Sequence, residues 1–410
     1  MLTPQLGNEA LAENRRTAFL GGLCLFLSVI EYAIPKPLPF MRIGLANLPL
    51  LLALDILKPK DFFLLALIKV LGQGIVGGTL FSYIFLFSLA GTFASAAVMF
   101  VLRRMSKKIG FAGIGCAGAM VSNAVQLFLA RYFIFSAAAA PALRFLIPPF
   151  LASGLVTGIA LGIICELFCR QSQWRAGVRK SATLSDTGEK RQYGESPDKG
   201  GFAVTDPAGG RERGPGRWSS FFNADELFIA GMIMALLFLF SPSLTGRVLQ
   251  FAFFVLLAIV SGRKKNMLVT VLVMAGIVIF NLLVPHGRVL VSFGPLRITQ
   301  ENLFAGLERA VTLTGLVMLS AACIKSDLRL PGRIGSLLGE SLRMLELLRR
   351  QKITTASGNI FQRIDKILLE TEAAACETQP DTSCKRPKRS IRKILLLFAM
   401  AAFTAVLGMI

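Results

Sequence analysis

Motifs that bind metals or nucleotide phosphates are nearly absent from this sequence. It has one histidine, His286, and its seven cysteines include no CxxC pair. Five cysteines lie in apolar runs and two in a basic tail, so we expect neither a zinc site nor a disulfide framework. No GxxxxGK motif followed by serine or threonine occurs, which excludes ATP hydrolysis by a P-loop of this chain. We predict no cofactor and no bound metal.

The chain is too apolar for an ordinary soluble domain. Hydrophobic residues make up 54% of its 410 residues, whereas their share in soluble domains is normally below half. Lysine and arginine number 45 against 24 acidic residues, and these basic residues gather in short segments between apolar runs. That arrangement is typical of cytoplasmic loops rather than of a nucleic-acid-binding surface. We predict an all-α integral membrane protein in contact with lipid and without a nucleic-acid partner.

The apolar runs predict ten or eleven helical spans, at about 20 residues for a full crossing and fewer beside a protein-lined cavity. Six fall in the first part of the chain, at 18–34, 45–57, 62–76, 80–102, 111–135 and 145–169. Five fall in the second part, at 227–240, 248–260, 267–284, 303–324 and 394–410. The first run follows two arginines as a signal peptide would, but no small-residue cleavage site precedes the Pro-rich segment after it, so we interpret it as a span.

Positive charge alternates between successive connections and predicts the orientation. Basic residues precede the first run and follow the second, fourth and sixth, and the second part repeats the pattern. Because cytoplasmic loops hold lysine and arginine, we predict a multi-pass protein of the cytoplasmic (inner) membrane. Its N-terminus would be cytoplasmic and its last span would end outside.

A change in composition divides the chain into two membrane domains. Residues 171–223 are rich in Gly, Ser, Arg, Glu and Asp, and such a segment cannot bury enough apolar surface to offset its ordering entropy. We predict a disordered cytoplasmic linker there. It joins a six-helix domain at 1–170 to a four- or five-helix domain at 224–410, which includes a cytoplasmic amphipathic helical region at 325–392.

Polar side chains inside the predicted spans mark a candidate site. A charge at the centre of a span costs about 2.5–3.5 kcal/mol on insertion scales, so it needs a partner or a cavity. We predict an outward-opening solute pocket formed by Glu31, Arg42, Asn47, Asn123, Gln126 and Arg131. The two arginines would favour an anionic group. Alternatively, these residues join helices or reach the headgroups, as would suit Arg131 and Asp55, and Lys69 could pair with Asp55.

Glycines at four-residue spacing predict close helix packing. They are Gly154, Gly158 and Gly162 in the sixth run, and Gly74 with Gly78 in the segment GQGIVGG. Small residues on one face let two backbones approach where lipid supplies no hydrophobic drive. We interpret these glycines as packing positions without a gating role.

The segment 30–131 resembles a known family. Glu31 precedes a Pro-rich loop, RIGLAN occupies 42–47, a Gly-rich third span follows, and SNAVQL occupies 122–127. These pieces resemble the Gx transporter family, also labelled heptaprenyl diphosphate synthase component I, whose members are similar to the six-helix S components of energy-coupling factor (ECF) importers. The resemblance covers 18–169 and implies that the first domain captures a vitamin-like or prenyl-precursor-like solute. Its motif positions here are Glu31, Arg42, Gly44, Asn47, Asn123 and Gln126.

The second domain is similar, more weakly, to the T component of the same importers. The segment GPLRITQENL at 294–303 leads into a span and then into the amphipathic region. This resemblance implies cytoplasmic ATPase subunits as partners. The family's Ala-Arg-Gly segments are missing, and Arg349 with Arg350 would take their place in the contact. Alternatively, the amphipathic helix rests on anionic lipid.

Three functions remain open at this point. The first is a non-enzymatic ECF-type importer subunit that binds a small solute and couples to a separate ATPase as the first domain reorients. The second is a non-catalytic membrane component of heptaprenyl diphosphate synthesis. Elongation itself would need clustered aspartates to hold magnesium, and no DDxxD motif occurs. In the third, the second domain is a structural or regulatory module without an ATPase partner.

Overall fold

The structure is a computed structural model that describes residues 3–33, 44–106, 108–135, 143–171, 222–262, 267–282, 288–293, 296–324, 328, 332–350 and 391–409. These residues are mostly helical, as expected where lipid leaves backbone polar groups to find partners within the chain. One antiparallel hairpin interrupts the described helices. It pairs β1 (Val289–Phe293) with β2 (Leu296–Thr299), and the sequence patterns did not predict it.

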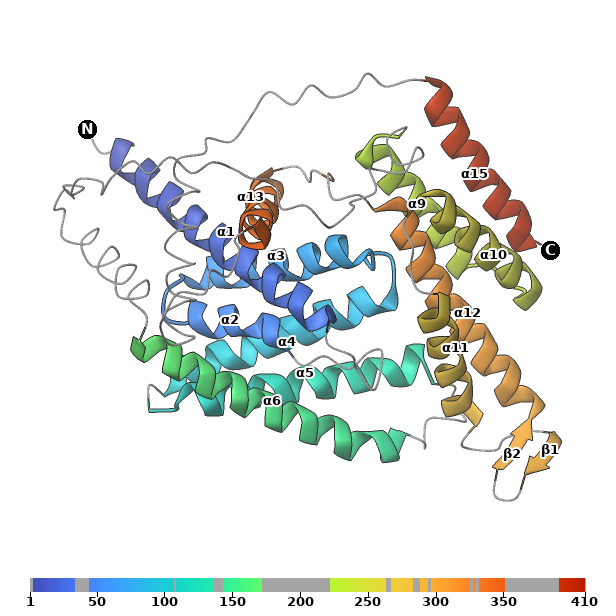
Figure 1. The fold of residues 1–410 in the computed structure, drawn as a ribbon, viewed down its shortest axis with the longest axis horizontal. Coiled ribbons are helices and arrows are strands. Elements are labelled where there is room, and N and C mark those ends of the chain that lie inside the picture. The colour runs from blue at the N-terminus through green and yellow to red at the C-terminus, as the bar shows by residue number, and fades with distance from the viewer. Residues whose placement is uncertain are drawn as a thin grey trace.

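The first bundle contains six α-helices and one 3₁₀ turn. They are α1 (Thr3–Ala33), η1 (Leu45–Asn47), α2 (Leu48–Ala53), α3 (Pro59–Gly77), α4 (Tyr83–Met105), α5 (Phe111–Phe133) and α6 (Leu143–Gln171). Helices α3, α4, α5 and α6 lie side by side in chain order, and α1 runs obliquely over α2 and α3 (Figure 1). The predicted span at 45–57 forms only η1, the six-residue α2 and flanking turns. At about 9 Å, α2 is too short to cross a bilayer.

The second bundle is built around one central helix. It contains α9 (Ala224–Leu239), α10 (Leu244–Val260), α11 (Met267–Leu282), α12 (Gln300–Cys323) and α15 (Ile391–Met409). Helix α12 packs against α9, α10 and α11, and α15 packs against α9 and α10. These helices coincide with the five runs predicted as spans.

Four described helices are long and apolar enough to cross a membrane, namely α4, α5, α6 and α12. Three shorter apolar helices lie in α10, α11 and α15. The chain is therefore a membrane protein, as predicted. Within the part of the chain that the structure describes, fewer helices reach the length of a full span than the ten or eleven predicted.

At one end of the first bundle, ion pairs between basic and acidic side chains connect several of its elements. Arg103, in the last turn of α4, donates from Nε and Nη2 to the two carboxylate oxygens of Asp55, both at 2.8 Å. Lys58 Nζ lies 3.0 Å from Glu13 Oε2 on α1. We refer to this end of the first bundle as the basic end. The hypothesis that Lys69 pairs with Asp55 is wrong, because Arg103 takes that carboxylate.

The second bundle packs across the opposite end of the first. Asn281 Nδ2 donates to the Ile134 carbonyl at 3.1 Å, and Arg309 Nη1 donates to the Phe135 carbonyl. Further along α12, Ser320 Oγ accepts from the backbone N–H of Phe81 at 3.3 Å. Positions 309 and 320 lie about 16 Å apart along α12, whereas the residues they contact are at the same end of the first bundle. Helix α12 therefore crosses that end, and its bundle runs obliquely to α4 and α5 (Figure 1).

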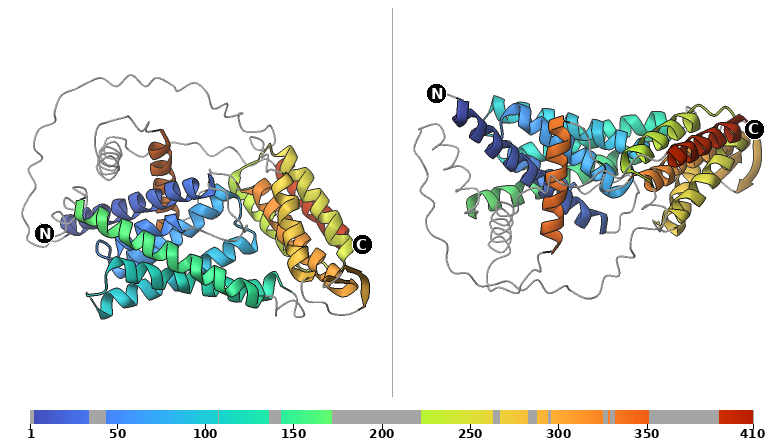
Figure 2. Two further views of the ribbon diagram at one scale, coloured as in Figure 1. Left: turned by 60° about the horizontal axis from the view of Figure 1, so that its bottom comes forward. Right: turned by 90° about the horizontal axis from the view of Figure 1, so that it is seen from above.

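One helix from the second half lies on the first bundle. Helix α13 (Gly332–Arg350) crosses α1 (Figure 2, right). Ser341 Oγ donates to the Ala18 carbonyl at 2.9 Å. The crossing is close because α1 carries two glycines there: a Cβ atom added to Gly22 would lie 2.5 Å from Met344 Cβ.

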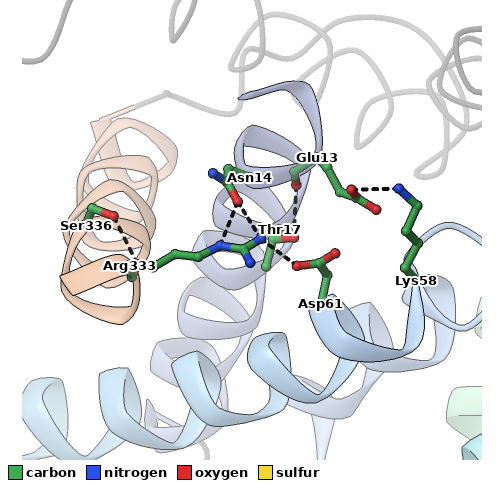
Figure 3. Close-up of polar contacts among 7 residues, drawn as sticks. All are labelled: Glu13, Asn14, Thr17, Lys58, Asp61, Arg333 and Ser336. Carbon is green, nitrogen blue, oxygen red and sulfur yellow. Dashed lines mark hydrogen bonds and ion pairs between the residues drawn. The ribbon is translucent and has the colours of Figure 1, made fainter. Parts of the chain in front are cut away.

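The apolar stripe of α13 is covered by this contact. Its members Leu337, Leu338, Met344, Leu345 and Leu348 are each at most 5% exposed. At the start of the helix, Arg333 donates to Asn14 Oδ1 on α1 at 2.7 Å and to Asp61 Oδ1 on α3 at 2.8 Å (Figure 3). The predicted amphipathic helix thus uses its apolar face within the chain.

Candidate functional site

A polar pocket lies inside the first bundle. Its empty volume is about 500 Å³, a figure that includes space open to the surface. Residues from α1, η1, α3, α4, α5 and α6 line it. Ten of the fourteen lining residues are polar or charged. A hydrophilic cavity within apolar helices needs an explanation, because polar groups are costly at membrane depth.

Lys69 occupies one wall of the pocket, between α3, η1 and α4. Its ammonium donates to Asn47 Oδ1 and, at 3.5 Å, to Thr92 Oγ1. Lys69 is only 4% exposed. Ten residues separate it from Pro59 at the start of α3, so it lies about 15 Å from the basic end. The structure therefore holds the Lys69 ammonium near the middle of the bundle, in contact with side-chain oxygens of η1 and α4.

Glu31 enters the pocket from the last turn of α1. It is also buried, at 4% exposed. One turn earlier on α1, Ser28 Oγ accepts a hydrogen bond of 2.6 Å from Gln73 Nε2 on α3. Gln73 follows Lys69 by four residues, so both side chains lie on one face of α3. This contact holds α1 against α3 between the levels of Lys69 and Glu31.

Helices α5 and α6 form the opposite wall. Gln126 Nε2 donates to Ser122 Oγ at 3.1 Å. Asn123 Nδ2 donates to the Phe150 carbonyl on α6 at 2.7 Å, which ties α6 to α5 where α6 contains two prolines. Thr157 and Leu161 complete this wall.

The structure brings together four of the six residues predicted to bind solute. Glu31, Asn47, Asn123 and Gln126 all line the pocket. Arg131 is exposed on α5 and does not line it. Arg42 lies outside the described residues. Gly44, another position of the family motif, lines the pocket with a left-handed backbone, φ 85°.

The site prediction missed several lining residues, including Lys69, Gln73, Ser88, Thr92 and Ser122. One signal could have found them. Lys69 with Gln73, Ser88 with Thr92, and Ser122 with Gln126 are pairs at four-residue spacing, which places each pair on one helix face. Polar stripes of this kind on three neighbouring apolar helices indicate a shared cavity.

The glycines of α6 lie directly against the backbone of α5. A Cβ atom added to Gly162 would lie 2.3 Å from Ala112 Cα, and one added to Gly158 would lie 2.6 Å from Cys116 Cα. A Cβ atom on Gly154 would meet Asn123 Nδ2 at 2.7 Å. Any side chain at these positions would force the two helices apart.

The glycines of α3 have two different environments. A Cβ atom added to Gly74 would lie 2.7 Å from Leu80 Cδ1. Gly78 instead ends the helix, with φ 57° and its N–H bonded to the Ile75 carbonyl at 3.2 Å. Its role in the fold is to terminate α3, since a left-handed conformation favours glycine.

The residues predicted to contact an ATPase lie at the end of α13. Arg349 is exposed, at the edge of the apolar stripe, one turn after Leu345. Glu346 is exposed on the same helix. The side chain of Arg350 lies outside the described residues. Helix α13 therefore presents a charged surface while its apolar face packs on α1 and α3.

Comparisons with known proteins match each half of the chain separately. Residues 227–326, which include α9 to α12, match a domain of unknown function (DUF8519). No curated protein and no solved structure matches the chain. Residues 20–168, which contain all the lining residues that the structure describes, match the family described as heptaprenyl diphosphate synthase component I.

Proposed function

We propose that the first bundle binds a small water-soluble solute in the pocket between Lys69 and Glu31. The observation that carries this proposal is the polar lining, which six elements of the bundle supply together. Helix adhesion alone needs pairs of polar groups in contact. It does not need ten polar residues around an open volume of about 500 Å³.

We further propose that the chain is the solute-binding and scaffold subunit of an ECF-type importer. The oblique packing of α12 across the end of the first bundle supports this proposal, because helices that cross a bilayer stand within about 40° of its normal. The two bundles are inclined to each other (Figure 1), and a reorientation of the first bundle between loading and release would change the tilt of its helices in the bilayer.

Helix α13 supports coupling to a separate ATPase. Its apolar stripe is already buried on α1 and α3, which leaves its charged face, with Glu346 and Arg349, for a cytoplasmic partner. Resting on lipid would require that apolar stripe to be free. A movement of α13 caused by the partner would pass directly to α1, which carries Glu31.

A second candidate function follows from the family match. The chain would then be a non-catalytic membrane component of heptaprenyl diphosphate synthesis, working with other synthase components. The two candidates differ in partner. The importer requires a nucleotide-binding subunit, and the synthase requires a soluble prenyltransferase.

Two measurements test these proposals. Small molecules retained by the purified full-length chain are identified by mass spectrometry, and Asn123→Ala and Arg42→Ala are expected to reduce retention while the protein still elutes as a single species. Unchanged retention in both variants would contradict the pocket. Chemical crosslinking at Arg349→Cys in native membranes then identifies the partner, and recovery of a prenyltransferase without an ATPase would favour the second function.

A further inference from the structure

The two charged residues of the pocket lie at different depths. Helix α3 begins at the basic end, and α1 passes this end at Glu13, which contacts Lys58. The Gln73–Ser28 hydrogen bond marks one common level of these helices. Lys69 lies four residues before that level and Glu31 three residues after it, so their backbones are separated by about 10 Å along the bundle.

The two charges favour different groups on a solute. An ammonium in surroundings of low polarity attracts an anion strongly, because charge-assisted hydrogen bonds gain strength there. Lys69 therefore favours a carboxylate, phosphate or other anionic group. Glu31, as a carboxylate, favours a cation or an N–H or O–H donor. Amide and hydroxyl groups from α3, α4 and α5 line the same pocket and can pair with further polar atoms.

The described part of the walls offers little to a hydrocarbon chain. Among the lining residues that the structure describes, those without a polar side chain are two alanines, one glycine and Leu161, and none is aromatic. An isoprenoid chain in this space would cover amides and hydroxyls without giving them hydrogen-bond partners. Each group covered in this way would weaken binding by about tenfold.

We infer that the pocket takes an elongated polar solute that carries an anionic group for Lys69 and a cationic or hydrogen-bond-donating group for Glu31, and that it excludes isoprenoid chains. This inference rests on the proposed solute binding. It assigns to the segment that matches the family a ligand class that the name of the family does not suggest.

The test compares solutes retained by the full-length chain purified in mild detergent. Wild type, Lys69→Gln, Lys69→Arg and Glu31→Gln are analysed by liquid chromatography and mass spectrometry, in both a hydrophilic and a lipid fraction. The matched control is Arg170→Gln, a charge removal at an exposed position outside the pocket. We expect a hydrophilic acid retained by wild type and control and reduced by about 30-fold in Lys69→Gln, the effect typical of losing one partner of a buried charge pair.

The remaining variants keep the test decisive if Lys69→Gln fails to fold. Lys69→Arg preserves the charge and should retain more of the acid than Glu31→Gln does. Retention of an isoprenoid by wild type, reduced by any pocket variant, would overturn the ligand class but leave solute binding intact. Equal contents in wild type and all folded pocket variants would instead overturn solute binding itself.

Discussion

Arg333 Nη2 lies 2.8 Å from Asp61 Oδ1, across 272 positions of sequence. This ion pair joins α13 to the first turn of α3 and places a helix of the second half on the first bundle. The Arg333 side chain is 56% exposed and that of Asp61 is 6% exposed. Pairs with one exposed partner contribute at most about 1 kcal/mol. The five buried apolar residues of α13 contribute about 1.5–3 kcal/mol each, so they hold the helix in place and the ion pair sets its position.

The first prediction compares these two contributions. Arg333→Ala should weaken the docking of α13 by about 1 kcal/mol or less, whereas Leu338→Glu should release the helix because it buries a charge in the contact. Hydrogen exchange of residues 332–350 measures the difference. Comparable loss of protection in both variants would show that the ion pair, not the apolar stripe, holds α13.

A second prediction concerns the crossing of α13 over α1. Gly22→Val should separate the two helices, because the added Cβ atom would lie 2.5 Å from Met344 Cβ and 3.0 Å from the Ser341 carbonyl oxygen. Gly339→Ala is the matched control, since a Cβ atom there meets nothing within 4 Å. The control should be neutral or stabilise α13 by up to about 1 kcal/mol through helix propensity. Hydrogen exchange of α13 in Gly22→Val that matches wild type would contradict the crossing.

A third prediction concerns pH. Burial and the neighbouring Glu13 raise the pKa of the Asp61 carboxyl above its ordinary value of 3.8, against the lowering effect of Arg333. The folded state therefore binds this proton more tightly than the unfolded state. The resulting stabilisation is complete below pH 3.8 and is lost as pH rises through the raised pKa.

Thermal unfolding in detergent tests this sign. Wild type should lose stability relative to Asp61→Asn as pH rises from 3.8, and the difference should become constant above the raised pKa. Asp225→Asn removes an exposed carboxylate from the first turn of α9 and serves as the control. A gain of wild-type stability over Asp61→Asn with rising pH would mean that Arg333 outweighs burial.

A fourth prediction concerns the division of the chain. Cutting the predicted linker near Gly200 should leave two membrane pieces that elute together, because apolar contacts of α11 and α12 with the first bundle, and of α13 with α1, hold them. Size-exclusion chromatography before and after cleavage provides the measurement. Separation of the pieces in mild detergent would show that these contacts are too weak to join the halves.

The depth of a residue along its helix could be predicted from the sequence better than the direction in which its side chain points around the helix. Asn123, Gln126 and Arg131 lie within nine residues of one predicted span, so the sequence indicates a similar depth for all three. Asn123 and Gln126 line the pocket, but Arg131 does not. It follows Gln126 by five residues, a rotation of about 140° around α5, so it points away from the pocket.

The surface that covers an apolar stripe could not be predicted either. The spacing of leucines in α13 indicated an amphipathic helix, which the structure contains. An apolar stripe favours burial against any apolar surface, whether lipid, a partner or the same chain. The feature of α1 that lets α13 pack against it is the glycine pair at Gly21 and Gly22. The role of this pair can be recognised only once α1 and α13 are known to be in contact.

The close packing of α5 on α6 has a consequence for how the pocket changes size. With Cα atoms of α5 within 2.6 Å of the Cβ positions of Gly158 and Gly162, these helices already touch along their backbones and cannot approach further. Separating them would leave voids along the whole seam, which costs free energy in proportion to the space opened. Because the wall formed by α5 and α6 is rigid, a change in the size of the pocket would have to come from its other elements, α1, η1, α3 and α4. Among these, α1 is the helix on which α13 rests.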